Sequence, residues 1–160
     1  MNALTSAVEA VICDPAGRVL LCQQAQGHRL WCLPGGRIRN AESPDRAVIR
    51  DIREETGLEI EVVDLVGLYH LTGDGGGCPL PDVLMYVFRA QAIHPEPTVN
   101  APGRICRLMW ASPDQLPWPT TATARAAIAD AMAGRSGVLR SVTRDREPVI
   151  QEAVEAPIAL

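Results

Sequence analysis

The chain has 160 residues, a net charge of −4 and a hydrophobic fraction of 47%, values that predict one globular domain with one core. All fifteen basic residues are arginine, which excludes chemistry that requires lysine, such as a Schiff base or a P-loop lysine on phosphate. The mildly acidic balance has no basic block and predicts no binding to a nucleic-acid polymer. The first seventeen residues lack arginine, no apolar run reaches the roughly 18 residues of a membrane span, and the five cysteines form no C-x-x-C pair. We therefore expect a cytoplasmic protein with free thiols and no membrane contact.

The first segments of the chain predict β structure. Two apolar runs, 7–13 and 18–25, flank Asp14-Pro15-Ala16-Gly17, and this order is typical of a β-hairpin. The run 30–33 then leads into Pro34-Gly35-Gly36, where glycine allows a tight bend or a close approach of the backbone to a ligand.

A helix follows over about Pro44–Thr56. Ser43 is placed as its N-cap, proline occupies its first position and Gly57 follows its end. The β-branched segments 58–71 and 83–90 predict long strands that cover this helix.

The second half of the chain is less regular. Residues 72–79 are rich in glycine and predict a flexible tip that could act as a lid, while 105–110 predicts a short strand. Thr120 or Thr121 caps a second helix to about residue 133. We assign 1–136 to the main domain and 137–160 to a C-terminal extension of it, an edge strand or a dimer arm.

Three carboxylates of the first helix form an unusual arc. At 100° per residue, Glu55 lies about 20° from Val48, in line with the apolar stripe that also contains Ile52. Asp51 forms like-charge pairs with Glu54 and Glu55 at helical spacing, which are unfavourable unless a cation compensates them.

Two interpretations of this arc are open. The charged run could be a solvated face in which Arg50 pairs with Glu54. Alternatively, the clustered oxygens bind a divalent cation, because hard oxygen ligands suit Mg²⁺ or Mn²⁺. The apolar position of Glu55 favours the metal.

The spacing of these residues resembles the signature of the Nudix hydrolase family. Gly36, five residues, Glu42, seven residues and then Arg50-Asp51-Ile52-Arg53-Glu54-Glu55-Thr56-Gly57-Leu58 match it except at Asp51, where the family has glutamate. The preceding 31–36 segment is similar to the usual lead-in, and the likeness extends over about residues 5–133.

The resemblance implies an α/β fold, an α/β/α sandwich around a mixed β-sheet whose signature forms a loop–helix–loop. It also implies a Mg²⁺- or Mn²⁺-dependent pyrophosphohydrolase in which water attacks phosphorus in a nucleoside di- or triphosphate or a nucleoside-diphosphate derivative. Its partner would be this small-molecule substrate, and a homodimer stays open because many relatives form one. The alternative is a nucleotide-binding or regulatory module of the same fold with weak or no catalysis.

Site residues follow from the resemblance position by position. Glu54, Glu55 and the Gly35 carbonyl would bind the metal, with Glu42 as a further ligand or as the partner of Arg50. Arg50 would orient the glutamates.

The general base is left open by the sequence. Asp51 stands where some relatives have the base, but its side chain is one methylene shorter. Acids on later loops are the alternatives, namely Asp74, Asp82 and Glu96.

Four residues outside the acidic arc are candidates for substrate binding: Arg29, Trp31, Arg37 and Arg104. Arg104 lies in a segment where many relatives carry a metal-binding glutamate, so we expect it to contact phosphate. Solvated arginines and a buried structural tryptophan are the alternative interpretation of the other three.

Overall fold

The computed structural model describes residues 4–73, 80–94 and 96–145. Its helices and strands follow in chain order: β1 (Thr5–Ile12), β2 (Val19–Gln24), β3 (Trp31–Cys32), β4 (Gly35–Arg37), α1 (Pro44–Thr56), β5 (Ile60–Thr72), β6 (Val83–Ala92), β7 (Ile105–Ala111), α2 (Ala122–Met132) and β8 (Val138–Thr143).

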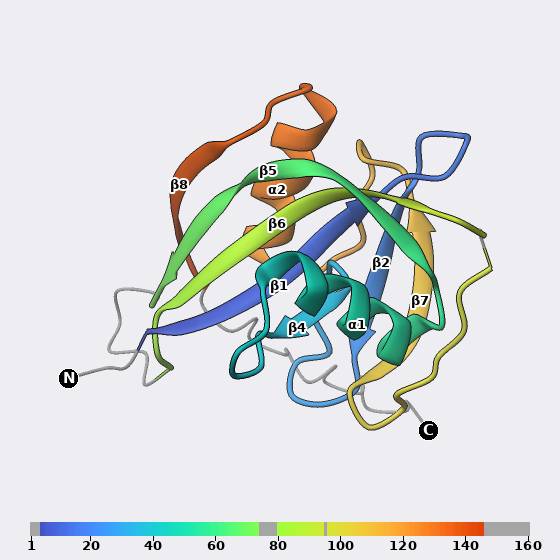
Figure 1. The fold of residues 1–160 in the computed structure, drawn as a ribbon, viewed down its shortest axis with the longest axis horizontal. Helices are drawn as coiled ribbons and strands as arrows, with labels where there is room; N and C mark the ends of the chain where they lie inside the picture. The colour runs from blue at the N-terminus through green and yellow to red at the C-terminus, as the bar shows by residue number, and fades with distance from the viewer. Residues whose placement is uncertain (1–3, 74–79, 95, 146–160) are drawn as a thin grey trace, which may run out of the picture.

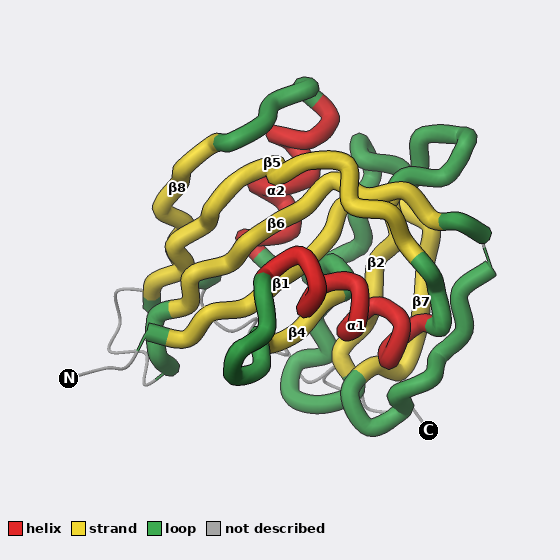
Figure 2. Tube along the Cα trace, in the orientation of Figure 1, coloured by secondary structure: helices red, strands yellow, loops and turns green. Residues whose placement is uncertain are grey.

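The strands form two sheets with a helix on either side. A five-stranded mixed sheet has the order β4-β1-β6-β5-β8, and a three-stranded antiparallel sheet has the order β3-β2-β7. In the larger sheet β1 pairs parallel with β6 and β5 pairs parallel with β8. The helix α1 crosses in front of the strands in Figure 1 and α2 lies behind them, as Figure 2 also shows. This arrangement confirms the predicted α/β class with a mixed sheet.

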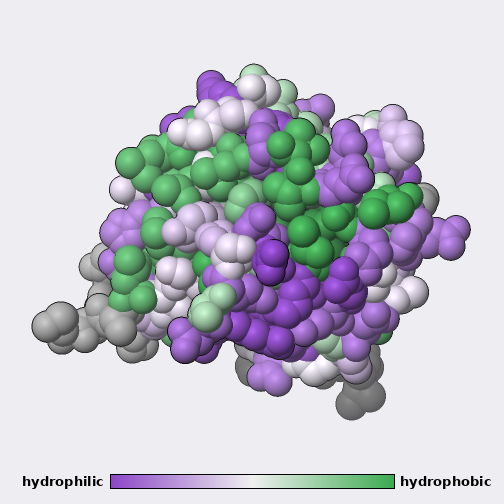
Figure 3. Space-filling view, viewed as in Figure 1, coloured by the Kyte–Doolittle hydropathy of each residue, from purple (hydrophilic) through white to green (hydrophobic). Residues whose placement is uncertain are grey.

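The alternation of β1 divides the interior into two clusters. Val8, Ala10 and Ile12 pack against α1, whereas Ala7 and Val11 face the cluster that contains α2. Side chains of a strand point alternately to its two faces, so β1 contributes to both clusters at once. Beyond this core, the surface in Figure 3 is hydrophilic over α1 and more hydrophobic over β5.

The helix α1 has the predicted bounds, because the residues that limit it act locally. Gly57 adopts a left-handed conformation with φ of 70°, and its N–H donates to the Arg53 carbonyl. The side chain of Ser43 makes no capping hydrogen bond. In α2, the Thr121 hydroxyl accepts from the Ala124 N–H, as predicted for one of the two candidate caps. No described helix is long and apolar enough to cross a membrane.

Both strands and the turn of the predicted N-terminal hairpin form, but the predicted pairing of the two strands is wrong. β1 and β2 are joined by the Asp14 turn and by one bridge between Cys13 and Val19, and then enter different sheets. The reason is that β1 pairs with β6 along its whole length, while β2 pairs with β7. Residues 138–143 form the edge strand β8. Residues 74–79 of the proposed lid, which include Asp74, lie outside the described residues.

Candidate active site

Two glycines of β4 lie in close contact with their surroundings, Gly35 with strand β1 and Gly36 with the acidic helix. A Cβ atom on Gly35 would lie 2.0 Å from the carbonyl oxygen of Val8 on β1. A Cβ atom on Gly36 would lie 2.8 Å from both Asp51 Oδ1 and Arg104 Nη2. Any side chain at either position would displace backbone or charged groups, so the site depends on glycine at both.

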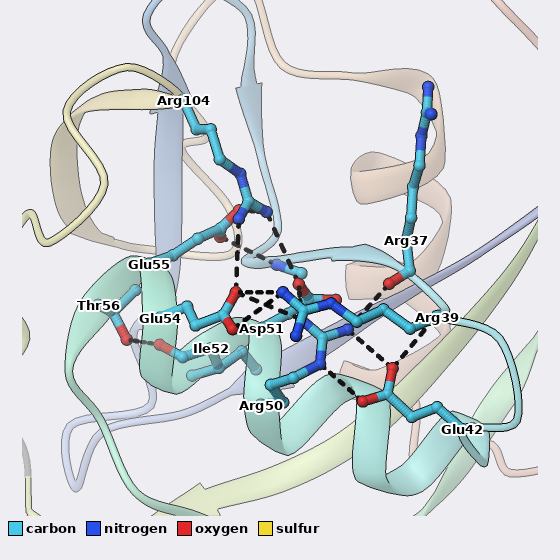
Figure 4. A network of polar contacts seen from close by, with 11 residues as sticks. Arg37, Arg39, Glu42, Arg50, Asp51, Ile52, Glu54, Glu55, Thr56 and Arg104 are labelled. Carbon is cyan, nitrogen blue, oxygen red and sulfur yellow. Dashed lines mark hydrogen bonds and ion pairs between the residues drawn. The ribbon is translucent and has the colours of Figure 1, made fainter.

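Arg50 holds the acids of this region in place (Figure 4). Its guanidinium donates to both oxygens of Glu42, at 2.6 and 2.8 Å, and to Asp51 Oδ1 at 3.0 Å. It also donates to Glu54 Oε2 at 3.3 Å and to the carbonyl oxygen of Arg37 at 3.2 Å. The hydrogen bonds from Arg50 to Glu42 lower the pKa of Glu42 to about 2, so this carboxylate stays ionised and paired.

Arg104 lies among the remaining carboxylates, at the end of the loop that leads into β7. Its Nη2 donates to Glu55 Oε1 at 2.7 Å and lies 3.7 Å from Asp51 Oδ1. Its Nη1 lies 3.9 Å from Glu54 Oε2. The Arg104 side chain is 46% exposed, so three carboxylates surround one guanidinium that is open to solvent.

Glu55 and Asp51 are buried acids. Glu55 is 5% exposed, and its Oε2 accepts the Gly35 N–H at 3.3 Å. Burial raises the pKa of Glu55 to about 7, against the lowering effect of Arg104. Burial also raises the pKa of Asp51, against Arg50 and Arg104. Asp51 Oδ2 is buried and has no hydrogen-bond partner among the described residues.

A cavity of about 300 Å³ opens beside these groups. Glu55 and Arg104 line it together with the two glycines of β4. Its other polar lining comes from strands of both sheets and from the start of α2: Glu9, Gln24, Cys32, Thr121 and Thr123. The cavity therefore connects the acidic arc with the layer between the sheets.

Glu9 is a buried acid of the cavity that was not among the site residues predicted from the sequence. It is 8% exposed, and burial together with the nearby Glu55 raises its pKa to about 8. The available signal was an acid in an apolar run, at an alternate position between Ala7 and Val11, both of which face the core.

The carboxylate oxygens of Asp51, Glu54 and Glu55 are of the type that binds a divalent cation such as Mg²⁺ or Mn²⁺. Three carboxylates already lie around one positive group, and Gly36, which has no side chain, allows Asp51 and Arg104 to lie close to the backbone of β4. As they stand, the acidic, histidine and cysteine side chains of the described chain form no metal-binding group of three. A hard cation on Glu55 would compete with Arg104, which already donates to Glu55 Oε1.

The other predicted site residues lie apart from this centre. Arg37 is exposed, and its side chain points away from the carboxylates in Figure 4. Arg29 is exposed and has a positive φ of 49°. Trp31 is 4% exposed in the core with the Arg107 guanidinium 5.7 Å from its ring centre, which favours the structural interpretation of this tryptophan.

Two of the alternative acids are described. Asp82 Oδ2 lies 3.2 Å from His70 Nε2, and Glu96 is exposed on a loop. Neither makes a described contact with the acidic arc of Asp51, Glu54 and Glu55, or with the three arginines that bind its carboxylates, Arg39, Arg50 and Arg104.

Comparisons with known proteins all point to one family. The model of the NUDIX domain matches residues 3–131. A "MutT-like protein" of Streptomyces ambofaciens is 38% identical over 68 residues, which are 42% of this chain and 44% of that protein. An "RNA pyrophosphohydrolase" of Teredinibacter turnerae is 34% identical over 61 residues, 38% of this chain and 36% of that protein. The matches thus span less than half of these two relatives.

Solved structures match over more of the chain. A MutT NUDIX hydrolase from Burkholderia pseudomallei is 31% identical and has a TM-score of 0.72, with 80% of this chain and 98% of that chain covered. A MutT protein from Bacillus halodurans has the same TM-score of 0.72 at 22% identity, covering 87% of this chain and 89% of that chain. The second likeness shows the fold alone.

Proposed function

The chain belongs to the NUDIX domain family, and from this premise we propose that it hydrolyses a diphosphate linkage with the help of Mg²⁺ or Mn²⁺. The observation that supports this proposal is the convergence of the Asp51, Glu54 and Glu55 carboxylates on one guanidinium beside a cavity. Such an arrangement concentrates negative charge at a place where a cation and a diphosphate can both be held.

Glu54, Glu55 and the Gly35 carbonyl would hold the metal in this proposal. A bound divalent cation supplies charge neutralisation for the phosphoryl oxygens and makes water more acidic. Glu42 would keep its ion pair with Arg50 and would not bind the metal, because Arg50 donates a hydrogen bond to each of the two carboxylate oxygens of Glu42. Arg50 is then a positioning residue that fixes the acids.

Arg104 would change partners when substrate binds. Its guanidinium is exposed and can donate to phosphate oxygens in pairs, which leaves Glu55 for the metal. Asp51 Oδ2, which has no described partner, would accept the proton of the attacking water. Arg29 and Arg37 are proposed to attract the anionic substrate from the exposed surface.

The substrate class is a nucleoside di- or triphosphate or a nucleoside-diphosphate derivative. Two relatives support this class, because their names, "RNA pyrophosphohydrolase" and "8-oxo-dGTP diphosphatase", each combine a nucleotide or a chain of nucleotides with a diphosphate linkage. We further propose that residues 1–136 form the catalytic domain, that 137–160 extend it, and that the protein acts in the cytoplasm.

The test is a panel of diphosphate compounds incubated with Mg²⁺ or Mn²⁺, with separation of the products. Glu55→Gln should keep the fold and lower kcat by at least about 100-fold, because a metal on this carboxylate supplies several kcal/mol of transition-state stabilisation. Glu61→Gln is the matched control, since Glu61 is an exposed acid on β5. Equal rates for Glu55→Gln and the unmodified protein would rule out the assignment.

A second function is a nucleotide-binding module without catalysis. The ion pair between Arg104 and Glu55 favours it, because this pair opposes metal binding. Tight nucleotide binding without product release in either metal would select this alternative.

A further inference from the structure

Two buried polar atoms in the cavity have no described partner. Glu9 Oε2 and Thr123 Oγ1 are each buried without a hydrogen bond, and both residues line the cavity beside Glu55. Glu9 is 8% exposed and Thr123 is 2% exposed. Native proteins pair nearly all buried polar atoms, so two unpaired atoms facing one cavity indicate a bound group that completes their hydrogen bonds.

The position of Glu9 makes a purely structural role difficult to explain. Glu9 shares the face of β1 with Ala7 and Val11, both of which pack in the apolar cluster. An apolar side chain at this position would continue that cluster without loss. The described contacts therefore include no interaction through which the Glu9 carboxyl group would stabilise the fold.

The walls of the cavity favour an organic group over a metal ion. Leu33, Leu71 and Met85 line it together with Glu9 and Thr123. Apolar walls with a few hydrogen-bonding groups are typical of sites for small organic ligands, and about 300 Å³ suits a compact one.

We propose that Glu9 and Thr123 recognise a nucleobase, with Glu9 Oε2 accepting an N–H of the base and the Thr123 hydroxyl bonding to a second polar atom of its edge. This inference rests on the proposed function, which assigns the phosphates to the Glu55 and Arg104 end of the same cavity. The three apolar side chains would contact the faces of the ring.

The experiment is calorimetric titration of the full chain, without metal, using AMP, GMP, CMP, UMP and ribose 5-phosphate. Ribose 5-phosphate keeps the sugar and phosphate but lacks the base. We expect at least one of the four nucleotides to bind about tenfold more tightly than ribose 5-phosphate. Glu9→Met and Thr123→Val should each reduce that preference several-fold and leave the affinity for ribose 5-phosphate unchanged.

Thermal unfolding separates this effect from damage to the fold. Glu9→Met replaces an unpaired buried carboxyl by an apolar chain of similar length, so its Tm should rise while base binding falls. Glu61→Met is the control for the change in charge, because Glu61 is exposed on β5 and should leave binding unchanged.

The proposal is overturned if Glu9→Met and Thr123→Val both keep the full base preference, or if no nucleotide binds better than ribose 5-phosphate. Base-selective binding without hydrolysis of any diphosphate would instead refute the proposed function and retain this site. Hydrolysis of a diphosphate at a rate that does not depend on the base, with no effect of either variant, would retain the proposed function and refute this site.

Discussion

Replacement of Arg104 by glutamine tests the electrostatics of the acidic arc. The substitution removes the guanidinium that donates to Glu55 at 2.7 Å and lies within 3.9 Å of Asp51 and Glu54. Glutamine keeps much of the length of the side chain and removes its charge. We therefore expect Arg104→Gln to bind Mn²⁺ more tightly than the unmodified protein.

The size of this gain follows from the contacts that the metal has to break. A hydrogen bond between charged groups contributes about 1.5–3 kcal/mol, and the lower end applies because the Arg104 side chain is 46% exposed. The two longer contacts add less, since water screens them. About 1.4 kcal/mol corresponds to a factor of ten, so the Kd for Mn²⁺ should fall about tenfold.

Calorimetric titration with Mn²⁺, in the absence of nucleotide, measures this change. Arg107→Gln is the matched control, because Arg107 lies three residues further along the chain, on β7, and contacts the Trp31 ring instead of the carboxylates. The KM for a hydrolysed diphosphate should rise in Arg104→Gln, since a phosphate contact is lost. An unchanged or weaker affinity for Mn²⁺ would show that Arg104 and the metal do not compete for Glu55.

Two further substitutions test the packing of the site and of α2. Gly36→Ala should lower kcat by about tenfold or more, since its Cβ would lie 2.8 Å from Asp51 Oδ1; steady-state kinetics would show this. Asp130→Asn should lower the free energy of unfolding at pH 7 by about 2 kcal/mol in urea titrations, because buried Asp130 accepts from two arginines and a tyrosine. These bonds hold the pKa of Asp130 well below 3.8, so its contribution is complete above about pH 4 and the two proteins should converge in stronger acid.

The helix that carries the acids could be predicted from sequence because its limits are local. Pro44 and Gly57 fix its ends through backbone conformation alone. The projection also placed Glu55 on the apolar side, and Glu55 is 5% exposed. The N-terminal hairpin was predicted wrongly because a turn sequence does not encode which distant strand is the better partner. β1 pairs with β6, which follows it by more than seventy residues.

The contacts of Arg104 and Glu9 depend on such distant pairing. Arg104 reaches Glu55 only because the start of β7 lies beside β2, on which it pairs antiparallel. Glu9 enters the cavity because β1 faces two clusters, and the sequence shows only that an acid interrupts an apolar run. Neither fact is contained in the local pattern around the residue.

The use of arginine has a structural reason in this site, where Arg39, Arg50 and Arg104 contact the carboxylates. Arg50 makes five hydrogen bonds, to Glu42, Asp51, Glu54 and the Arg37 carbonyl. A lysine ammonium has three donors at one point and could not span these groups. Arg50 is 19% exposed and fixed on several sides, whereas Arg104 is 46% exposed and makes one short bond. The guanidiniums of Arg50 and Arg104 thus differ in exposure and in the number of their hydrogen bonds, and Arg104, which has fewer, lines the cavity.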